Sequence, residues 1–446
     1  MDFAPHTHDD DKEMLAAIGL AELDELFEPI ESSLQLTRPL AVPPALDEVE
    51  LLDHLSRLAG RSSGPDELVC FAGGGSYDHH LPPVVKALAA RAEFATSYTP
   101  YQPELSQGVL QAVFEFQTLV CELYGMEVAN ASLYDGANAL VEAVTLSMRA
   151  TRRRRVLVGA TVHPHYVEVL RTYTSGLDLD IELVPFGDDG AVHWASVDAA
   201  GAAGVVCAYP NFFGRIEDLE SASSSAHAAG ALSIAVTDPT AMGVLASPAA
   251  LGADVAVGEG QGLGNPKSYG GPYVGLFATK LDHVRQVPGR IAGQTLDADG
   301  RRAFVLTLQA REQHIRRAKA TSNVCTNQTL MAIFAAVYLG WLGPQGLERL
   351  GEVCLRRTAF AARRLADIPG CEIAFEGPHF KELVLRTPGD ATELARKLAS
   401  RGYLAGPALG RWWPELGDCL LLAVTERRTE EHITGLAEAI EKELAG

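Results

Sequence analysis

The spacing of apolar residues divides the chain into three parts, and the first of them is helical. Short amphipathic segments there predict three helices, over residues 12–18, 21–27 and 47–59. The last of these places Leu51, Leu52, Leu55 and Leu58 on one face. A proline-rich link, residues 38–44, separates the first two helices from the third. We therefore expect residues 1–65 to form an N-terminal helical arm.

The central part begins with helices and then alternates β-branched apolar runs with helical stripes. The first helices are predicted over residues 106–124 and from Asp135 to about 152. Five strands follow, predicted over residues 155–159, 181–184, 204–209, 231–237 and 254–257, with helices over 166–174 and 217–229 between them. Such alternation is typical of βαβ units. Residues 66–325 are therefore predicted to form a large α/β domain with a mostly parallel sheet.

The last part repeats this mixture on a smaller scale. It starts with helices predicted over 327–342 and 348–366, interrupted at Gly343-Pro344. Two strands (372–375, 382–386), a helix (391–400), a strand (419–424) and a final helix (429–444) complete it. Residues 326–446 are therefore predicted to form a smaller C-terminal α/β domain.

Composition narrows the function classes. Of the 446 residues, 47% are hydrophobic and 21% charged, which is typical of a globular protein, and the net charge is −20. Such a charge repels phosphates, so we expect neither nucleic acid nor a membrane as partner. The seven cysteines are scattered and form no CxxC pair, and the N-terminus has no signal-peptide pattern. These features predict a cytoplasmic protein.

Two strand ends carry the most informative side chains. Asp238 ends the predicted strand 231–237, and a glycine-rich loop containing Lys267 follows the strand 254–257. Ligands of open α/β sheets bind at the carboxyl ends of the strands. An aspartate at one strand end and a lysine beyond the next is how one large fold of pyridoxal-phosphate (PLP) enzymes holds its cofactor. Lys267 is either that lysine or an ordinary loop residue.

Other candidates are less specific. The helix that begins near Asp135 could bind a phosphate at its N-terminus, but Asp135 places a carboxylate there and is a good N-cap. His163, after a strand, could stack on a ring or orient a substrate, or be structural. The histidines lack the spacing of metal ligands, so no metal site is expected. The segment from Ser97 to Gly108 is dense in hydrogen-bonding side chains and is either a site wall or a helix lead-in: Tyr98, Thr99, Tyr101, Gln102, Glu104 and Gln107.

Several long motifs resemble those of the P-protein of the glycine cleavage system, glycine dehydrogenase (decarboxylating). The resemblance runs essentially from end to end, and the length matches the separate alpha subunit (subunit 1). Its motifs are Leu51-Leu-x-His54-Leu, Phe116-Gln-Thr118, Ala129-Asn-Ala-Ser-Leu133, Gly258-Glu-Gly-Gln261, Gly270-Gly-Pro-Tyr273, Pro288-Gly-Arg-Ile291, Phe304-Val-Leu-Thr-Leu-Gln309, Arg311-Glu-Gln-His-Ile-Arg316 and Thr321-Ser-Asn-x-Cys325-Thr-Asn327.

The resemblance implies an aspartate-aminotransferase-like fold, PLP fold type I, in which an alpha and a beta subunit mimic a homodimer. It implies that the beta subunit carries the PLP lysine and that this chain binds no cofactor covalently. The place of that lysine falls on Gln261, or on Gly262, and Asp238 matches the aspartate that binds the pyridinium nitrogen. Asp238, Gln261 and His163 would then be vestigial cofactor positions. Lys267 departs from the family, which usually has an apolar residue there.

The implied function is that of one subunit in an α2β2 glycine decarboxylase. With the beta subunit the chain would decarboxylate glycine, release CO2 and transfer the aminomethyl group to the lipoyl arm of H-protein. Tyr98, Thr99, Tyr101 and Gln102 would face the shared site, while Glu104 and Gln107 would hold the loop. Two alternatives stay open: a self-sufficient PLP transferase or lyase that uses Lys267, and a non-catalytic structural or regulatory subunit.

Overall fold

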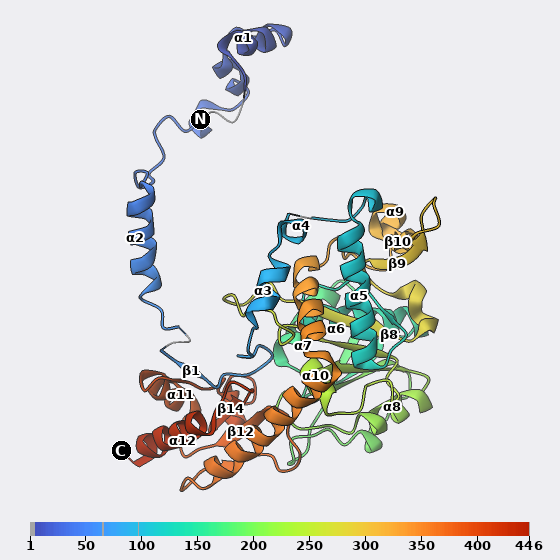
Figure 1. Cartoon of the computed structure of the whole chain (residues 1–446), viewed down its shortest axis with the longest axis vertical. Coiled ribbons are helices and arrows are strands. Elements are labelled where there is room, and N and C mark those ends of the chain that lie inside the picture. Colours follow the sequence, from blue (N-terminus) through green and yellow to red (C-terminus); the bar gives the residue numbers. More distant parts are fainter. Residues whose placement is uncertain (1–4, 65–66, 97, 446) are drawn as a thin grey trace. The chain divides into compact units, whose positions relative to one another are not determined.

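In this computed structural model the chain divides into two units, with the boundary along the sequence between Ser63 and Gly64, and helices α1 and α2 belong to the first unit (Figure 1). The structure describes residues 5–64, 67–96 and 98–445, so the predicted boundary at 65/66 lies outside the described residues. The first unit contains α1 (His8–Ala17), two 3-10 turns (Leu23–Phe27, Ser32–Leu34) and α2 (Glu48–Ala59). Capping boxes start both helices, at Thr7 and at Asp47.

The first unit has little core of its own. None of its described residues is buried, and the leucine face predicted for α2 is exposed. An amphipathic helix normally obtains its stability from burying that face. The arm is therefore a segment whose apolar side chains are left uncovered within this unit.

A seven-stranded sheet forms the centre of the second unit, in the order β2-β8-β7-β6-β5-β3-β4. The strands from β3 to β7 pair in parallel, whereas β8 is antiparallel to both β7 and β2. Their bounds are β2 Val128–Ala129, β3 Arg155–Gly159, β4 Asp180–Val184, β5 Ala202–Tyr209, β6 Leu232–Thr237, β7 Val255–Glu259 and β8 Gly275–Thr279. The predicted α/β fold with a mostly parallel sheet is confirmed.

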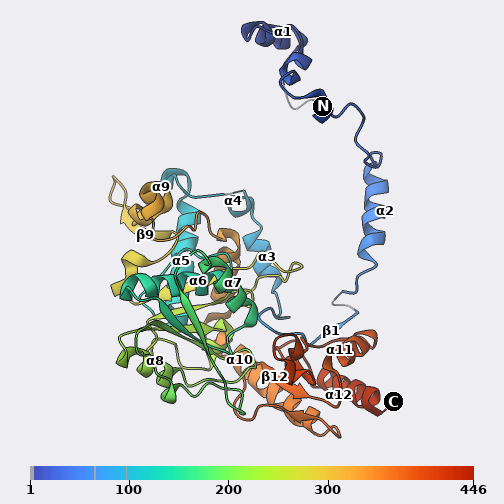
Figure 2. The same cartoon turned by 180° about the vertical axis from the view of Figure 1, so that it is seen from behind.

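Helices cover both faces of this sheet (Figure 2). On one face α6 (Gly136–Thr151) and α7 (Pro164–Thr174) pack against strand residues such as Val156 and Val158. On the other face α5 (Gln107–Tyr124), α8 (Leu219–Ala228) and α10 pack against alternate residues such as Leu157. Because successive strand side chains point to opposite faces, the buried run Val156-Leu-Val158 of β3 has to be apolar on both faces.

Some elements were not anticipated from the sequence. Strand β8 and the antiparallel pair β9 (Ile291–Leu296) and β10 (Arg302–Thr307) lie in stretches with no strand pattern. Gly293, Gln294 and Thr295 interrupt the apolar pattern of β9, which is half exposed. Short helices complete this region: α3 (Pro83–Ala89), α4 (Ala92–Ala95) and α9 (Gln313–Arg316).

The C-terminal part carries a second, antiparallel sheet in the order β11-β12-β14, covered by α11 and α12 (Figures 1 and 2). Its bounds are β11 Glu372–Ile373, β12 Glu382–Arg386, α11 Ala391–Ser400, β14 Cys419–Ala423 and α12 Glu430–Ala445. Strand β1 (Val69–Cys70), at the start of the unit, pairs in parallel with β13 (Tyr403–Leu404). This pairing ties the start of the second unit to its C-terminal part.

Helix α10 (Thr329–Ala366) connects the two sheets. It spans both of the helices predicted over residues 327–342 and 348–366. Gly343 has a φ of +62° and Pro344 follows, so the helix kinks where the sequence predicted an interruption. Among the described helices, α10 alone has the length and composition of a membrane span. It packs against α3, α5 and α12 as a core helix of the second unit. The division into large and small domains near residue 325 stays a prediction.

Candidate functional site

Asp238 lies at the carboxyl end of β6, where the sequence predicted a ligand site, and its carboxylate is fully engaged. The Lys381 ammonium is 2.6 Å from one carboxylate oxygen. The other oxygen accepts hydrogen bonds from the backbone N–H and the hydroxyl of Thr240, at 2.9 and 2.7 Å. Burial acts to raise the pKa of Asp238, but Lys381 and Thr240 together lower it below its usual value. Asp238 is therefore an ionised group whose counter-ion belongs to the same chain.

Lys381 is the residue at this site that the sequence did not point to. It precedes β12 on the small sheet and is 1% exposed. Its ammonium also donates to His79 Nε2 at 3.0 Å and to the Thr240 hydroxyl at 3.1 Å, and it lies 3.5 Å from the centre of the Tyr77 ring. All three ammonium protons therefore have acceptors. Lys381 has a φ of +46°, a conformation that residues other than glycine adopt only when their surroundings enforce it.

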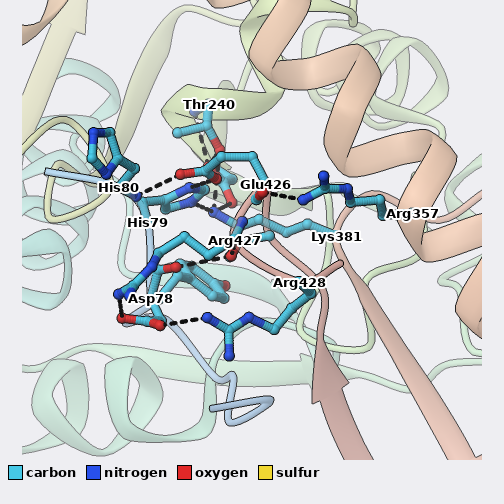
Figure 3. A network of polar contacts seen from close by, with 12 residues as sticks. Asp78, His79, His80, Thr240, Arg357, Lys381, Glu426, Arg427 and Arg428 are labelled. Atoms are coloured by element: carbon cyan, nitrogen blue, oxygen red, sulfur yellow. Dashed lines mark hydrogen bonds and ion pairs between the residues drawn. The ribbon is translucent and has the colours of Figure 1, made fainter. Parts of the chain in front are cut away.

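The polar network continues from Lys381 to Glu426 (Figure 3). His79 Nδ1 lies 2.6 Å from a Glu426 carboxylate oxygen. Because a lysine ammonium can only donate, His79 Nε2 accepts and the ring proton is on Nδ1, directed at Glu426. Burial acts to raise the pKa of Glu426, but the hydrogen bonds that it accepts from His79 and from the His80 backbone N–H lower it below its usual value. Two carboxylates, a histidine and a lysine thus form one continuous chain of hydrogen bonds.

Asp78 is the second centre of charge (Figure 3). Its carboxylate lies 2.8 Å from each of three cations, Lys267, Arg427 and Arg428. Asp78 and Arg428 are buried, whereas the Lys267 side chain is 41% exposed. Lys267 is thus the cation partner of Asp78 at the edge of the network. This placement favours the sequence-based interpretation in which Lys267 has no covalent role.

Gln261, at the place where the resemblance puts the missing lysine, is buried and fully bonded. Its side-chain oxygen accepts from the Tyr77 backbone N–H at 2.9 Å. Its amide nitrogen donates to the carbonyl oxygens of Tyr77 and Asn265, at 3.2 and 3.0 Å. Gln261 therefore fixes the backbone of Tyr77, whose ring covers the Lys381 ammonium.

The N-terminus of α6 is already occupied by carboxylates. Asp135 caps the helix by accepting from the Asn138 backbone N–H at 2.7 Å, as its position in the sequence predicted. Glu259 accepts from the Gly136 backbone N–H at 3.0 Å. Burial raises the pKa of Glu259 to about 8. Because these backbone donors are already used by Asp135 and Glu259, the helix end is a poor place for a phosphate.

A cavity of about 70 Å³ is left among these groups. Asp238, His163 and Tyr77 line it, together with Glu259 and Glu382. Burial raises the pKa of Glu382 to about 7, although Gly74 N–H and the Tyr77 hydroxyl both donate to its carboxylate. Drug-sized ligands occupy pockets of roughly 300–1,000 Å³, so only a much smaller group would fit here.

The side chain of His163 lines the cavity, and its ring is neutral and stacked on a neighbouring ring. Its Nε2 lies 2.8 Å from the Gly74 carbonyl oxygen and its Nδ1 accepts from the His165 backbone N–H at 3.1 Å. The ring stacks on Tyr166 with the centroids 4.8 Å apart. Since Nε2 donates and Nδ1 accepts, a second proton would break the bond to His165. Burial lowers the pKa of His163 to about 4.

The described part of the segment 98–108 forms a second, exposed site next to Arg290; Ser97 lies outside the described residues. Tyr98 is 80% exposed and Tyr101 51%. The buried Arg290 guanidinium donates to the Tyr101 hydroxyl at 2.7 Å and lies 4.8 Å from the centre of its ring. Arg290 also donates to the Cys325 carbonyl oxygen at 2.6 Å, which joins two motif segments to Tyr101.

The remaining predicted residues of this segment differ in exposure, and Glu104, which was expected to hold the loop with Gln107, is exposed. Gln102 and Glu104 are exposed, and Thr99 is partly buried. Gln107 accepts from the Phe304 backbone N–H at 2.8 Å and donates to the Phe304 carbonyl oxygen at 2.9 Å. Gln107 therefore ties the start of α5 to β10 and holds the loop.

Comparison with known proteins agrees with this geometry. The model of the glycine cleavage system P-protein family matches residues 1–440. The chain belongs to this family. It is 49% identical to a probable glycine dehydrogenase (decarboxylating) subunit 1 of Desulforamulus reducens, covering 98% of both chains. A protein of the same name from Moorella thermoacetica is also 49% identical, over 100% of both chains.

Solved structures show the same fold. A glycine decarboxylase (P-protein) of the glycine cleavage system, in inhibitor-bound form, superposes with a TM-score of 0.91 and 44% identity, covering 99% of this chain and 100% of that one. A glutamate decarboxylase of Lactobacillus brevis has a TM-score of 0.68 at 13% identity over 94% of this chain and 96% of its own, and shares the fold alone. The predicted PLP fold type I architecture is thus confirmed.

The residues of this P-protein chain do not fit PLP. The aspartate that would bind the ring nitrogen is paired with Lys381, and a glutamine stands near the lysine position. The helix end that would bind the phosphate faces Asp135 and Glu259, and the cavity is small. Each polar group that the cofactor would need already has a partner within the chain.

Acidification is expected to destabilise the chain through His163. Its pKa is about 4 when folded and about 6.5 when unfolded, so the unfolded state takes up the proton first. This contribution to stability is present above pH 6.5 and is lost as the pH falls towards 4. Between pH 7 and pH 5 the free energy of unfolding should fall by about 2 kcal/mol more in the wild type than in His163→Gln. Urea unfolding at both pH values measures this difference, and equal losses would contradict it.

Proposed function

We propose that the chain is the alpha subunit of a glycine decarboxylase of the glycine cleavage system and acts with a second subunit that holds the PLP. The observation that carries the proposal is the combination of end-to-end similarity to proteins named subunit 1 with a cofactor position whose groups are all paired internally. A chain of this kind is inactive alone. The name subunit 1 itself supports the existence of a partner chain.

The glycine substrate, the lipoylated H-protein and the α2β2 assembly form the finer part of the proposal. Their support is the similarity to a glycine decarboxylase described as part of the glycine cleavage system. When bound to the partner, PLP supplies the electron sink for loss of the carboxylate. The residues of this chain would bind and orient the substrate and exclude water from the site that the two subunits share. A cytoplasmic location stays a prediction.

The exposed tyrosines are the part of this chain that we propose lines the shared site. Tyr98 and Tyr101 each present a hydroxyl, and Tyr101 is held by Arg290 and by the edge of the His314 ring, 6.3 Å away. Exposed apolar residues stand near them in the sequence or next to their contacts: Leu105 follows Tyr101 by four residues, and Ile315 follows His314. Such a mixture of rigid aromatic anchors and apolar surface is typical of protein interfaces.

Removing either tyrosine hydroxyl should slow the reaction of the assembled pair. We expect Tyr98→Phe and Tyr101→Phe each to lower kcat/KM for glycine–CO2 exchange by about tenfold or more, the cost of one hydrogen bond to a charged group. Tyr173→Phe, in an exposed tyrosine of α7, is the matched control. Unchanged exchange in both variants would instead support a purely structural subunit.

A further inference from the structure

Lys381 and its acceptors form a complete ammonium site beside the small cavity, which two of the surrounding residues, Asp238 and Tyr77, also line. The acceptors are Asp238 Oδ2, His79 Nε2 and the Thr240 hydroxyl, with the face of the Tyr77 ring on a further side. These partners come from two stretches of the chain, 77–79 and 238–240, and Lys381 comes from a third, directly before β12. Such a cage, with one charge partner, two neutral acceptors and an aromatic face, is the chemistry by which proteins recognise a primary ammonium ion.

We infer that Lys381 is a tethered ammonium ligand that permanently takes the place of the cofactor's ring cation against Asp238. This inference rests on the proposed function in one respect, namely that the cavity is the relic of a PLP site. In a PLP site of this fold, the cation that faces the aspartate is the pyridinium ring of the cofactor. In this chain it is the ammonium group of Lys381, which directly precedes the small-sheet strand β12. Folding of the chain therefore fills the site, and only the partner subunit is left to bind PLP.

The positions around Lys381 support a permanent rather than an exchangeable occupant. Its backbone φ is +46°, a conformation that is uncommon for residues other than glycine. The neighbouring Glu382 side chain accepts from the Gly74 N–H at 2.6 Å and from the Tyr77 hydroxyl at 2.8 Å, which holds the ring against the ammonium. A side chain added at Gly73 would lie 2.3 Å from the Glu382 carboxylate, so these segments are in close contact.

The same geometry predicts which small molecule would bind if the Lys381 side chain were shortened to that of alanine. In Lys381→Ala the atoms removed beyond Cβ correspond to n-propylammonium. The three acceptors and the ring would remain, so the free ion would find the same hydrogen-bond partners. Its neutral analogue, 1-propanol, would leave the charge of Asp238 unpaired, which is costly at a buried position.

The test is chemical rescue in the full 446-residue chain. We expect Lys381→Ala to lower the Tm on the order of 5 °C. Added n-propylammonium chloride should restore most of that loss in a saturable way, while sodium chloride at equal ionic strength and 1-propanol should not. The matched control is the double variant Asp238→Asn/Lys381→Ala, which should show no specific rescue. An unchanged Tm in Lys381→Ala, or equal rescue by 1-propanol or in the double variant, would overturn the inference.

A measurement on the unmodified chain keeps the inference testable if Lys381→Ala does not fold. Under reductive methylation of the native chain, Lys381 should stay unmodified, whereas Lys267 and Lys280, with side chains about 40% exposed, should react. Methylation of Lys381 at the rate of Lys267 would refute its buried pairing. Neither experiment uses glycine or a partner, so their failure is distinct from a failure of the proposed enzyme activity.

Discussion

Glycine–CO2 exchange is expected to rise at least about 10³-fold when this chain is mixed with its partner subunit and PLP, compared with the sum of the separate chains. The chain alone lacks a free lysine at the cofactor position, and its Asp238 already has a cation. The partner alone lacks the surface that Tyr98 and Tyr101 would provide. Measuring exchange with labelled bicarbonate over a range of mixing ratios gives both the activity and the stoichiometry.

A matched variant separates the alternative enzyme from the proposed one. Lys267→Ala removes the lysine that a self-sufficient PLP enzyme would need, yet it changes only one of three cation contacts of Asp78. We expect the mixed complex with this variant to keep its exchange rate within about twofold. Exchange by the isolated chain that disappears in Lys267→Ala would establish the alternative.

Replacing Asp78 by alanine is expected to lower the free energy of unfolding by about 3–5 kcal/mol. The variant leaves Arg428, whose side chain is 5% exposed, without its counter-ion, and it also releases Arg427. A buried charge without a partner is far more costly than the loss of a surface ion pair. Denaturant unfolding followed by tryptophan fluorescence measures this cost.

Lys267→Ala is the control for this prediction as well. Because the Lys267 side chain is 41% exposed, its removal should cost no more than about 1 kcal/mol. Similar losses for Asp78→Ala and Lys267→Ala would show that the Asp78 network is solvated and contributes little.

The central strands β3, β5, β6 and β7 could be predicted from the sequence because they are buried on both faces. The runs 156–159 and 204–209 are apolar without alternation, and they make up the greater part of β3 and of β5. Strand β8 was missed, although it is buried, because its five residues begin with Gly275 and carry no β-branched side chain before Thr279. The hairpin β9–β10 was missed because half-exposed strands carry mixed side chains.

The candidate site could be predicted only in part. Asp238 and His163 were expected near one crevice, and both line the cavity. Lys381 could not be predicted, because its partners His79 and Thr240 lie 302 and 141 residues away and no local pattern connects them. One usable signal was the pair of charged runs, Asp78-His-His80 and Glu426-Arg-Arg428, whose charges are complementary.

The central claim is that this chain completes a PLP enzyme without holding the PLP. Borohydride reduction of the mixed complex with PLP, followed by peptide mapping, tests it most directly. We predict one phosphopyridoxyl-lysine per pair, on the partner subunit, and none on the isolated chain or on this chain within the complex. A phosphopyridoxyl group on Lys267, or on any other single lysine of this chain, would contradict the account.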